Sequence, residues 1–349
     1  MSTAATHPTA PSTPVAGPVV VVGGGLSGVA CARALHDAGR EVVVVDRGHR
    51  IGGRMASKRL EGRPVDTGAS YLTVSDRRFA EVVEAWRVAG LAHRWTDTFS
   101  VLEPGADPSV KEGPVRWGTP GGMRSLVEAL AEGLDVRRGA VERVESGDDG
   151  LRVVADGVDL APAGAVVLAM PDEQAARLLG GDHGAVAARL TRPSEPVIAL
   201  VARWPERAWD SAAPGGAFDG AFVNGDDDVA WIADDGRRRG DDAPVLVAHS
   251  TPALAARHLD DPAAAGPVLV AALRRLLDLP EPASTLVHRW SLAKPTGERA
   301  EPCLLAEVPG GLVGVCGDGW GPQSKVEGAW LSGTALAEAL LRLPDQSSR

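Results

Sequence analysis

The chain has 349 residues, of which 44% are hydrophobic, and its formal net charge is −10. This composition is typical of a globular α/β protein, and the length is sufficient for two domains. The negative charge argues against a general nucleic-acid-binding surface. The three cysteines show no C-x-x-C spacing and the eight histidines are scattered singly, so we expect no metal site, dithiol centre or disulfide framework.

Residues 1–17 are rich in proline, threonine and alanine, and they lack the basic start and apolar core of a signal peptide. We therefore expect a disordered N-terminal tail. No apolar run approaches the roughly 20 residues that span a bilayer. Together these features predict a cytoplasmic protein that does not contact a membrane.

The first ordered element predicted is a strand that leads into a glycine turn. "VVVVGGGLSG" begins with four β-branched residues, which suit a strand buried on both faces. Gly23, Gly25 and Gly28 then have G-x-G-x-x-G spacing, and an amphipathic helix pattern follows. Strand, tight turn and helix N-terminus together predict a site for a dinucleotide pyrophosphate.

The next strand, "REVVVVD", ends in Asp46. A carboxylate about 20 residues beyond the glycine turn can accept both hydroxyls of an adenosine ribose, although a strand-end cap is the alternative. "RIGGRM" follows, in which Arg54 can form charge-assisted bonds to phosphate; an ordinary surface turn would have the same composition.

The middle of the chain contains fewer motifs. A helix is predicted after Asp76, a helix within 118–134, a β-meander with a D-D-G turn at 148–150, and a buried strand at 164–171. Residues 172–285 alternate helical and strand patterns without glycine motifs, as in a separate substrate-side domain. The run "GRRRG" at 236–240 lies between acidic pairs, and we interpret it as a solvated loop, with an anion-binding patch as the alternative.

The C-terminal region again has the pattern of a strand, a glycine turn and a helix, as the N-terminal region does. A buried strand runs into Gly317 and Asp318, and a long helix begins near Val326. A flavin dinucleotide is often held by such a second element, whose helix directs its positive end at the flavin, whereas a nicotinamide dinucleotide needs only the first motif. The two ends of the chain therefore predict one flavin site.

These motifs, with "GGRM", "VDTGASY", "RWGTPGGM" and "GDGWGPQSKVEGAWLSG", resemble the flavin amine oxidase superfamily from Val19 to about Leu343. Within it the chain is most similar to bacterial renalase-like proteins. The resemblance implies an α/β fold in which a Rossmann-like FAD-binding domain, with a parallel sheet and β-meander, carries a second α+β substrate domain. The implied FAD-binding domain comprises 18–75, 117–171 and 286–345, and the substrate-binding domain comprises 76–116 and 172–285.

By position, the resemblance also implies which residues hold the FAD. The glycine turn would cradle the pyrophosphate, Asp46 the ribose, the 69–71 segment the isoalloxazine, Val141 the adenine, and the C-terminal motif the ribityl chain and pyrimidine edge. The predicted cofactor contacts are Gly23, Gly25, Leu26, Ser27, Gly28, Asp46, Arg47, Gly53, Arg54, Ala69, Ser70, Tyr71, Val141, Gly317, Asp318, Val326, Glu327 and Ala329. The cysteine that tethers flavin in monoamine oxidases is missing from "VEGAWLSG", so noncovalent FAD is expected.

Candidate substrate contacts are fewer. The only tyrosine, Tyr71, is assigned to the flavin side, so a two-tyrosine amine cage cannot form within one chain. None of the four lysines has a strong claim to a place near flavin N5. His288 and Trp290 are expected to face one side of a strand that resembles the pocket strand of renalase-like proteins, and we add Trp117 as a third pocket-wall residue; a purely structural strand is the alternative.

Renalase-like proteins are understood to oxidise the 2- and 6-dihydro isomers of NAD(P)H, passing electrons on to oxygen. A dihydropyridine ring needs a flat slot and little acid–base help, which agrees with the absence of an evident general base. The resemblance thus implies an FAD-dependent oxidase with a small-molecule substrate and molecular oxygen as acceptor, in a monomer or homodimer. The alternatives are an amine oxidase or desaturase-like dehydrogenase acting on a secondary metabolite, and a non-catalytic FAD-binding protein.

Overall fold

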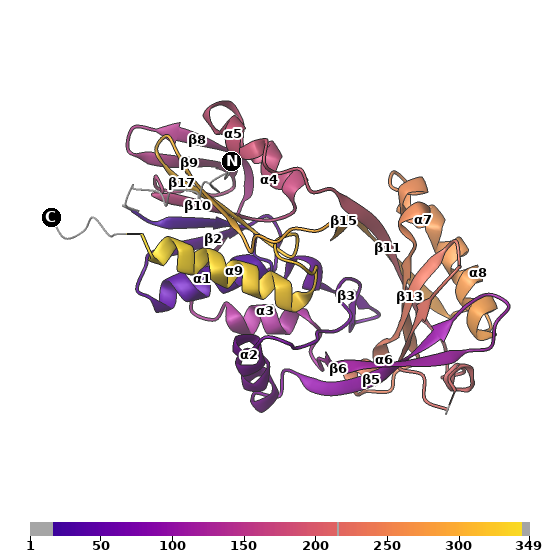
Figure 1. The fold of residues 1–349 in the computed structure, drawn as a ribbon. Coiled ribbons are helices and arrows are strands. Elements are labelled where there is room, and N and C mark those ends of the chain that lie inside the picture. The colour runs from indigo at the N-terminus through magenta and orange to yellow at the C-terminus, as the bar shows by residue number, and fades with distance from the viewer. Residues whose placement is uncertain (1–16, 215, 344–349) are drawn as a thin grey trace, which may run out of the picture.

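Strands from both ends of the chain meet in one six-stranded sheet (Figure 1). In the computed structural model, which describes residues 17–214 and 216–343, β1 and β17 lie on either side of β10 and run parallel to it. Residues 1–16 of the expected tail lie outside the described residues. In spatial order the strands are β16 (Leu304–Val308), β17 (Gly311–Cys316), β10 (Ala165–Ala169), β1 (Val19–Val22), β2 (Val42–Asp46) and β7 (Asp135–Arg138).

Helices and a hairpin cover the two faces of this sheet. On one face α1 (Leu26–Asp37) and α9 (Val326–Leu341) bury the side chains of Leu35 and Leu336 against the strands. On the other face lie α4 (Asp172–Leu178), α5 (Gly184–Ala187) and the hairpin of β8 (Ala140–Gly147) and β9 (Gly150–Asp156). Coverage of both faces explains why the valine runs are uninterrupted by polar residues. The expected meander is therefore β7, within the sheet, followed by a two-stranded hairpin that turns at 148–149.

The first and last helices of this lobe are in direct backbone contact. A Cβ built on Gly333 of α9 would lie 1.9 Å from the backbone oxygen of Ser27 in α1, so no side chain fits there. Two further helices, α2 (Arg77–Val88) and α3 (Arg124–Leu130), pack against α1 and against Trp330 of α9. This packing fixes the beginning of α9 relative to the glycine turn.

The second lobe is built on a seven-stranded sheet that is antiparallel except between β12 and β5. In spatial order its strands are β15 (Ser284–Pro295), β11 (Ser194–Arg203), β14 (Val245–Ser250), β13 (Val229–Asp234), β12 (Gly220–Val223), β5 (His93–Leu102) and β6 (Ser109–Gly118). One face is apolar, through residues such as Leu200 and Ile232, and packs against α7 (Pro252–Arg257) and α8 (Ala265–Leu277).

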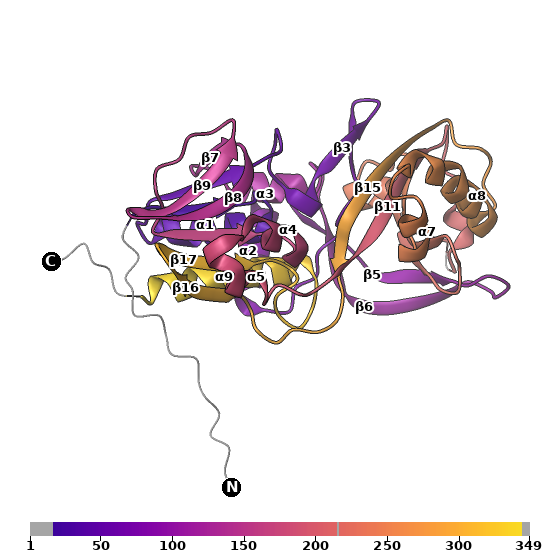
Figure 2. The ribbon, with the colours of Figure 1, turned by 90° about the horizontal axis from the view of Figure 1, so that it is seen from above.

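The opposite face of this sheet is turned toward the first lobe. A hairpin of β3 (Ser57–Leu60) and β4 (Arg63–Asp66) packs Leu60 and Val65 against Val201 and Val247 of the sheet. Figure 2 shows this hairpin rising between the two lobes. The remaining helical segments are α6 (Asp235–Arg239) and the short 3-10 turns Gly53–Met55, Gly181–His183, Asp210–Ala212 and Pro262–Ala264.

The structure changes three expectations. The run 236–240 is not a solvated loop, because it lies on α6, where Arg238 is 1% and Arg239 is 5% exposed. The expected domain boundary at residue 286 falls inside β15, which pairs with β11 in the seven-stranded sheet, so 286–295 belong with the substrate lobe. Residues 77–88, assigned to the substrate domain, form α2 and pack against α1.

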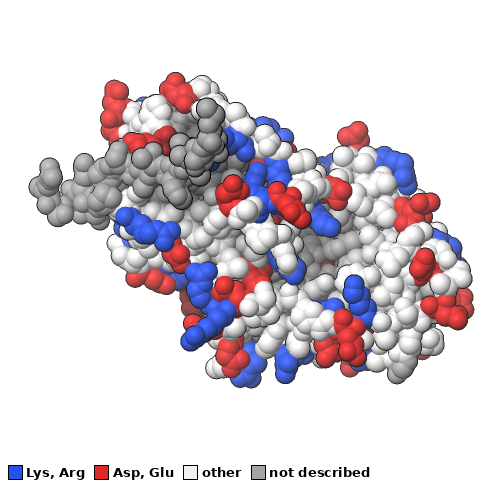
Figure 3. Space-filling view, viewed as in Figure 1, with Lys and Arg blue, Asp and Glu red and all other residues white. Residues whose placement is uncertain are grey.

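The charged surface is mixed in sign. On the face drawn in Figure 3, basic and acidic side chains are interspersed over both lobes. Among the helices described for residues 17–214 and 216–343, none is long and apolar enough to cross a membrane. In the same residues no group of three or more histidine, cysteine, aspartate or glutamate side chains is arranged to hold a metal ion.

Candidate functional site

The glycine turn after β1 is constrained by close backbone contacts. Gly23 has φ +114°, in the region that favours glycine, and a Cβ on Gly28 would lie 2.0 Å from the backbone oxygen of Gly23. A second glycine turn packs on the first, because Gly52 N–H donates to the Gly24 carbonyl over 2.8 Å. Gly25 caps α1 without a side-chain hydrogen bond, which leaves the N-terminal N–H groups of that helix available to an anion.

Asp46 lies beside this turn at the end of β2. Its carboxylate accepts hydrogen bonds from Gly24 N–H at 2.6 Å and from Gly48 N–H at 2.7 Å. It also lines a cavity of about 310 Å³, together with Arg50, Val136 and Arg138. A volume of this size is at the lower end of the range for small-molecule sites. The cavity is adjacent to the helix N-terminus, where the adenosine end of a dinucleotide is expected.

Arg54 and Asp318 join the two predicted halves of the site. The Arg54 guanidinium donates to both carboxylate oxygens of Asp318, at 3.0 and 2.5 Å, and to the carbonyl of Ala293 at 3.1 Å. Ser324 also donates to Asp318, at 2.7 Å. Residues that are 264 positions apart in sequence are thus in direct contact. In this structure they bond each other, so a ligand that uses either one has to compete with the ion pair.

Glu327, in the first turn of α9, is already engaged. It is 6% exposed and accepts hydrogen bonds from the backbone N–H groups of Ser75 and Asp76, at 2.6 and 2.7 Å. Its carboxylate therefore orders the chain that enters α2. Of the remaining expected contacts at this end, Val326 and Ala329 lie half-buried beside the α1–α2–α3 core, and Gly317 donates its N–H to Ser332.

A row of rings crosses the inner face of the seven-stranded sheet. Strand register places Trp231 opposite His249, His249 opposite Ala199, and Ala199 opposite His288. Residues directly opposite one another in antiparallel strands point to the same face. The ring of Trp290, two residues beyond His288 on β15, lies 4.6 Å from the His288 ring at 88°. We refer to Trp231, His249, His288 and Trp290 as the ring row.

The ring row holds the segment 67–71, which carries three of the predicted flavin contacts. The carbonyl of Thr67 accepts a hydrogen bond from Trp290 Nε1 at 2.9 Å and lies 3.1 Å from His249 Nε2. Trp231 Nε1 donates to Ser70 Oγ at 3.1 Å. A Cβ on Gly68 would lie 1.9 Å from the Arg54 carbonyl, so this segment is packed between the ring row and the second glycine turn.

The histidines of the ring row are neutral at physiological pH. Burial lowers the pKa of His249 to about 4, although its contact with the Thr67 carbonyl acts in the opposite direction. Burial also lowers the pKa of His288 to about 4, and the positive charges of Lys58 and Arg289 act in the same direction. Lys58, for which the sequence predicts no strong role, thus lies within electrostatic range of the ring row.

An aromatic cluster continues from the ring row beyond Trp231. Its ring centroids are between 4.7 and 6.2 Å apart. The members are Tyr71, Trp95, Phe99, Phe222 and Trp231. Arg116 is buried here, with its guanidinium 4.1 Å from the Phe99 ring centroid and in hydrogen-bonding contact with Tyr71. The tyrosine assigned to the flavin side is therefore part of a larger aromatic surface.

The remaining expected residues lie outside the ring row. Trp117, the penultimate residue of β6, donates its backbone N–H to the Leu72 carbonyl at 2.9 Å. Val141 pairs with Ala155 in the β8–β9 hairpin and is not among the residues that line the Asp46 cavity. Leu26 and Ser27 are the first two residues of α1, and Gly53 faces Gly25 across the two glycine turns. Ala69 packs against the core around α1, and Arg47 directly follows β2.

The residues present fit an FAD group. In the first glycine turn a Cβ would collide with backbone, and in the second a Cβ on Gly53 would lie 3.1 Å from Gly25 Cα. A helix N-terminus is uncapped, and a carboxylate lines an adjacent cavity. Thr67 Oγ1 is a buried polar atom without a partner, next to the segment expected to face the flavin ring. When bound, FAD supplies an acceptor for hydride or electrons, which these side chains lack.

Comparison with known families agrees with this geometry. The model of the flavin containing amine oxidoreductases matches residues 105–341, and that of NAD(P)-binding Rossmann-like domains matches residues 21–97. Polyamine oxidase 4 of Oryza sativa subsp. japonica is 52% identical over 54 residues, which is 16% of this chain and 11% of that protein. Human flavin-containing amine oxidase B is 43% identical over 67 residues, which is 19% of this chain and 13% of that protein. The matches thus span only a small part of the curated relatives.

Solved structures share the fold over nearly the whole chain. A putative protoporphyrinogen oxidase from Exiguobacterium sp. 255-15 has a TM-score of 0.70 at 14% identity, covering 94% of this chain and 99% of that one. Putrescine oxidase bound to putrescine has a TM-score of 0.69 at 16% identity, covering 93% and 99%. Cyclohexylamine oxidase from Brevibacterium oxydans has a TM-score of 0.70 at 16% identity, and the match covers 93% of this chain and 98% of that one. The fold, the glycine and carboxylate site, and a family match over residues 105–341 together lead to one conclusion: this chain belongs to the flavin-containing amine oxidoreductases, and its cofactor is FAD.

Proposed function

We propose that the protein is an FAD-dependent oxidase of renalase type, which oxidises 2- and 6-dihydro isomers of NAD(P)H to NAD(P)+. A hydride would leave the dihydropyridine ring for flavin N5, and oxygen would then take the two electrons, with one further proton, to give hydrogen peroxide. The observation that carries this proposal is the charge around the ring row: His288 is neutral, and the charges acting on it are the cations Lys58 and Arg289.

This charge pattern suits one kind of electron donor better than another. An amine substrate binds as a cation or must lose a proton first, and a histidine with a pKa of about 4 is a weak base at neutral pH. A dihydronicotinamide dinucleotide carries phosphate charges that Lys58 attracts, and it needs no base to release hydride. The flat Trp290 and the neutral His288 would orient its ring, and His288 can hydrogen-bond a carboxamide.

The second candidate is an amine oxidase, which the family match favours. In this structure the half-buried ring of Tyr71, which packs against the buried Phe99, is an aromatic group that could contact an ammonium group. However, Arg116 already lies over the Phe99 ring at 4.1 Å and contacts Tyr71. A second cation at this end of the site would be repelled by Arg116, and this repulsion is one argument for the proposed dihydronicotinamide substrate.

FAD is expected to be held without a covalent bond. The cysteine closest in sequence to the C-terminal motif is Cys316, which is fully buried. Burial raises the pKa of its thiol to about 12, so it is a poor nucleophile toward a flavin. Precipitation of the protein with acid should release all the yellow colour into solution.

Anaerobic reduction tests the proposal. Purified holoprotein is mixed with 6-dihydro-NAD, 2-dihydro-NAD, putrescine or cyclohexylamine, and the visible flavin band is followed. We expect rapid bleaching by at least one dihydro isomer, none by the amines, and peroxide on readmission of air. Bleaching by an amine alone would replace the proposal with the amine oxidase candidate. Holoprotein that is photoreduced normally but is inert to every donor would favour a non-catalytic flavoprotein.

A further inference from the structure

The arginines of α6 form a buried ion network that joins the two lobes. Asp235 and Arg238 are at most 1% exposed, and Arg239 is 5% exposed. A Cβ on Gly236 would lie 2.1 Å from the Ala243 carbonyl, so the helix turns tightly against the chain that follows it. Asp235 bonds Arg238 and Arg239 from within the same helix and also Arg63 of the β3–β4 hairpin. Buried charges of this kind are tolerated only when they are paired.

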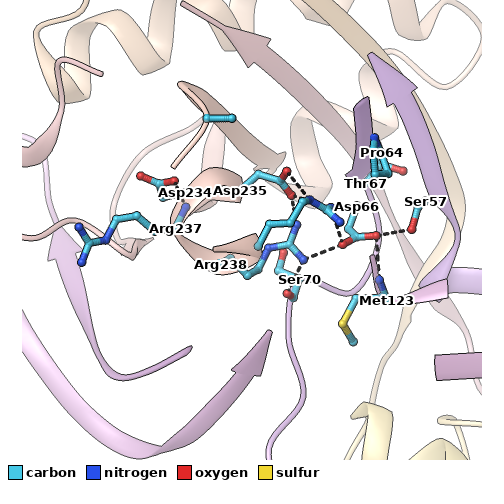
Figure 4. A network of polar contacts seen from close by, with 12 residues as sticks. Ser57, Pro64, Asp66, Thr67, Ser70, Met123, Asp234, Asp235, Arg237 and Arg238 are labelled. Carbon is cyan, nitrogen blue, oxygen red and sulfur yellow. Dashed lines mark hydrogen bonds and ion pairs between the residues drawn. The ribbon is translucent and has the colours of Figure 1, made fainter. Parts of the chain in front are cut away.

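Arg238 reaches from the substrate lobe to the segment beside the predicted flavin ring. One of its terminal nitrogens donates to Asp66 Oδ2 at 2.8 Å and to the Ser70 carbonyl at 2.8 Å. Figure 4 shows Arg238 directed toward Asp66 and Ser70, whereas Arg237 on the same helix points away. The two ends of the 66–70 segment are therefore held by one guanidinium.

Asp66 connects Arg238 to two further elements. Its Oδ1 accepts hydrogen bonds from Ser57 Oγ on β3 at 2.5 Å and from Met123 N–H, at the start of α3, at 3.1 Å. Its Oδ2 also accepts from Arg239 at 3.1 Å. Burial disfavours the ionised form, but the charges of Arg238 and Arg239 outweigh this and lower the pKa of Asp66. An ionised carboxylate with four donors fixes the position where the segment begins.

Between its two ends the segment is held by uncharged groups. The Thr67 carbonyl accepts from Trp290 and lies 3.1 Å from His249 Nε2. Ala69 N–H donates to the Arg54 carbonyl at 3.0 Å. Arg238 supplies the charged contact to the backbone of this segment, because its guanidinium donates directly to the Ser70 carbonyl. A movement of Arg238 would therefore shift the backbone at Ser70, next to Ala69 and Tyr71, which are expected to line the isoalloxazine.

We propose that Arg238 and Asp66 are a positioning pair, through which the substrate lobe sets the placement of segment 67–71 against the flavin. Neither residue has to touch the substrate. The inference depends on FAD binding and not on which donor reduces the flavin, so it can be tested without a substrate.

The test compares Arg238→Lys and Arg238→Met with Arg237→Met as the matched control. Arg237 lies on the same helix and bonds Asp219 instead. Lysine retains the positive charge near Asp66 but cannot bond Asp66, Ser70 and Asp235 together in the fixed geometry of a guanidinium. We expect the Lys variant to fold, to bind FAD about tenfold more weakly and to show an altered flavin circular dichroism spectrum. The Met variant should be weaker still, and Arg237→Met should match the wild type.

The measurements are the dissociation constant of FAD, the flavin circular dichroism of the holoprotein, and the midpoint of thermal unfolding of the apoprotein. If Arg238→Met does not fold, Arg238→Lys decides. A Lys variant with lowered thermal stability but wild-type FAD affinity and flavin spectrum would show that the pair only stabilises the fold, and would overturn the proposal. The same result in a folded Met variant would overturn it as well.

Discussion

The two sheets of this molecule place their functional groups differently. In the six-stranded sheet both faces are covered, and the groups proposed to hold FAD lie at the ends of the strands or just after them, at the glycine turns, Asp46 and Asp318. In the seven-stranded sheet only one face is covered by helices, and the candidate substrate contacts lie on the other face, in the ring row. A parallel sheet buried on both faces leaves only its strand ends for ligands, whereas a sheet covered on one side offers a whole surface.

Mutations in the two sheets should therefore have different effects. At the strand ends of the first sheet the backbone is the proposed binding group, so a single added atom should weaken cofactor binding. On the face of the second sheet the side chains are the proposed contacts, and substitutions there should change which donor reacts before they change whether the protein folds.

The largest effect is expected for Gly28→Ala. The new Cβ would lie 2.0 Å from the Gly23 carbonyl, which forces the turn or α1 to move. We expect FAD affinity to fall by about 100-fold or more, because the helix N-terminus and the turn both shift from the pyrophosphate. Absorbance of the purified protein, followed by titration of the apoprotein with FAD, measures this.

Gly184→Ala is the matched control for that variant. Gly184 has φ −56° and no neighbour within 4 Å of an added Cβ, so the substitution should leave FAD affinity and stability near those of the wild type. Equal flavin content in the two variants would mean that the turn is more plastic than its contacts suggest.

A smaller and more selective effect is expected for Lys58→Met. The side chain contributes positive charge near His288, and its removal should lower kcat/KM for the dihydronicotinamide by about tenfold, mainly through KM. Lys111→Met, an exposed lysine on β6, is the control and should change nothing. If both variants keep the wild-type kcat/KM, Lys58 does not select the substrate by charge.

The neutral histidines predict a pH dependence of stability. In the folded protein the pKa of His249 and of His288 is about 4, against about 6.5 in an unfolded chain. Between these values the unfolded state binds more protons, so the free energy of unfolding falls as the pH drops from about 6.5 to about 4. His288→Gln should flatten this fall by on the order of 1–3 kcal/mol, measured by denaturant unfolding at several pH values.

The smallest effect concerns the thiols. Cys31, Cys303 and Cys316 are far apart in sequence but share one core beside β17, and burial raises the pKa of all three. Their thiolate fractions are low, so native protein should react with a disulfide reagent about 100-fold more slowly than denatured protein. Fast reaction of any thiol in the native state would contradict this burial.

Much of the first lobe could be predicted from sequence, because its signals are local. The valine runs and the glycine spacing are patterns within a few residues, and Asp46 lies only 22 residues from its partner Gly24. The contact between Gly28 and Gly23 is short-range as well. The place of the C-terminal motif beside the first turn follows from sequence only indirectly, because a flavin dinucleotide is often held by a second strand, turn and helix. Its direct contact, Arg54 with Asp318, depends on the full fold.

The substrate side was harder to predict, because its contacts depend on strand register. The proximity of Trp231, His249 and His288 can be derived only from three strand pairings, which the sequence does not reveal. The burial of the run 236–240 could not be predicted, because charged residues between acidic pairs normally remain in water. Its buried partner, Asp66, is 172 residues away from Arg238, and no local pattern connects them.

The position of β10 between β1 and β17 also bears on how the protein is made. Residues 93–295 contain every strand of the substrate lobe, so that lobe can fold while the ribosome is still adding the rest of the chain. The six-stranded sheet and the second half of the proposed FAD site are incomplete until β17 and α9 have emerged. We therefore expect FAD to be captured only after both elements are made, and a chain cut short before Gly311 to be colourless.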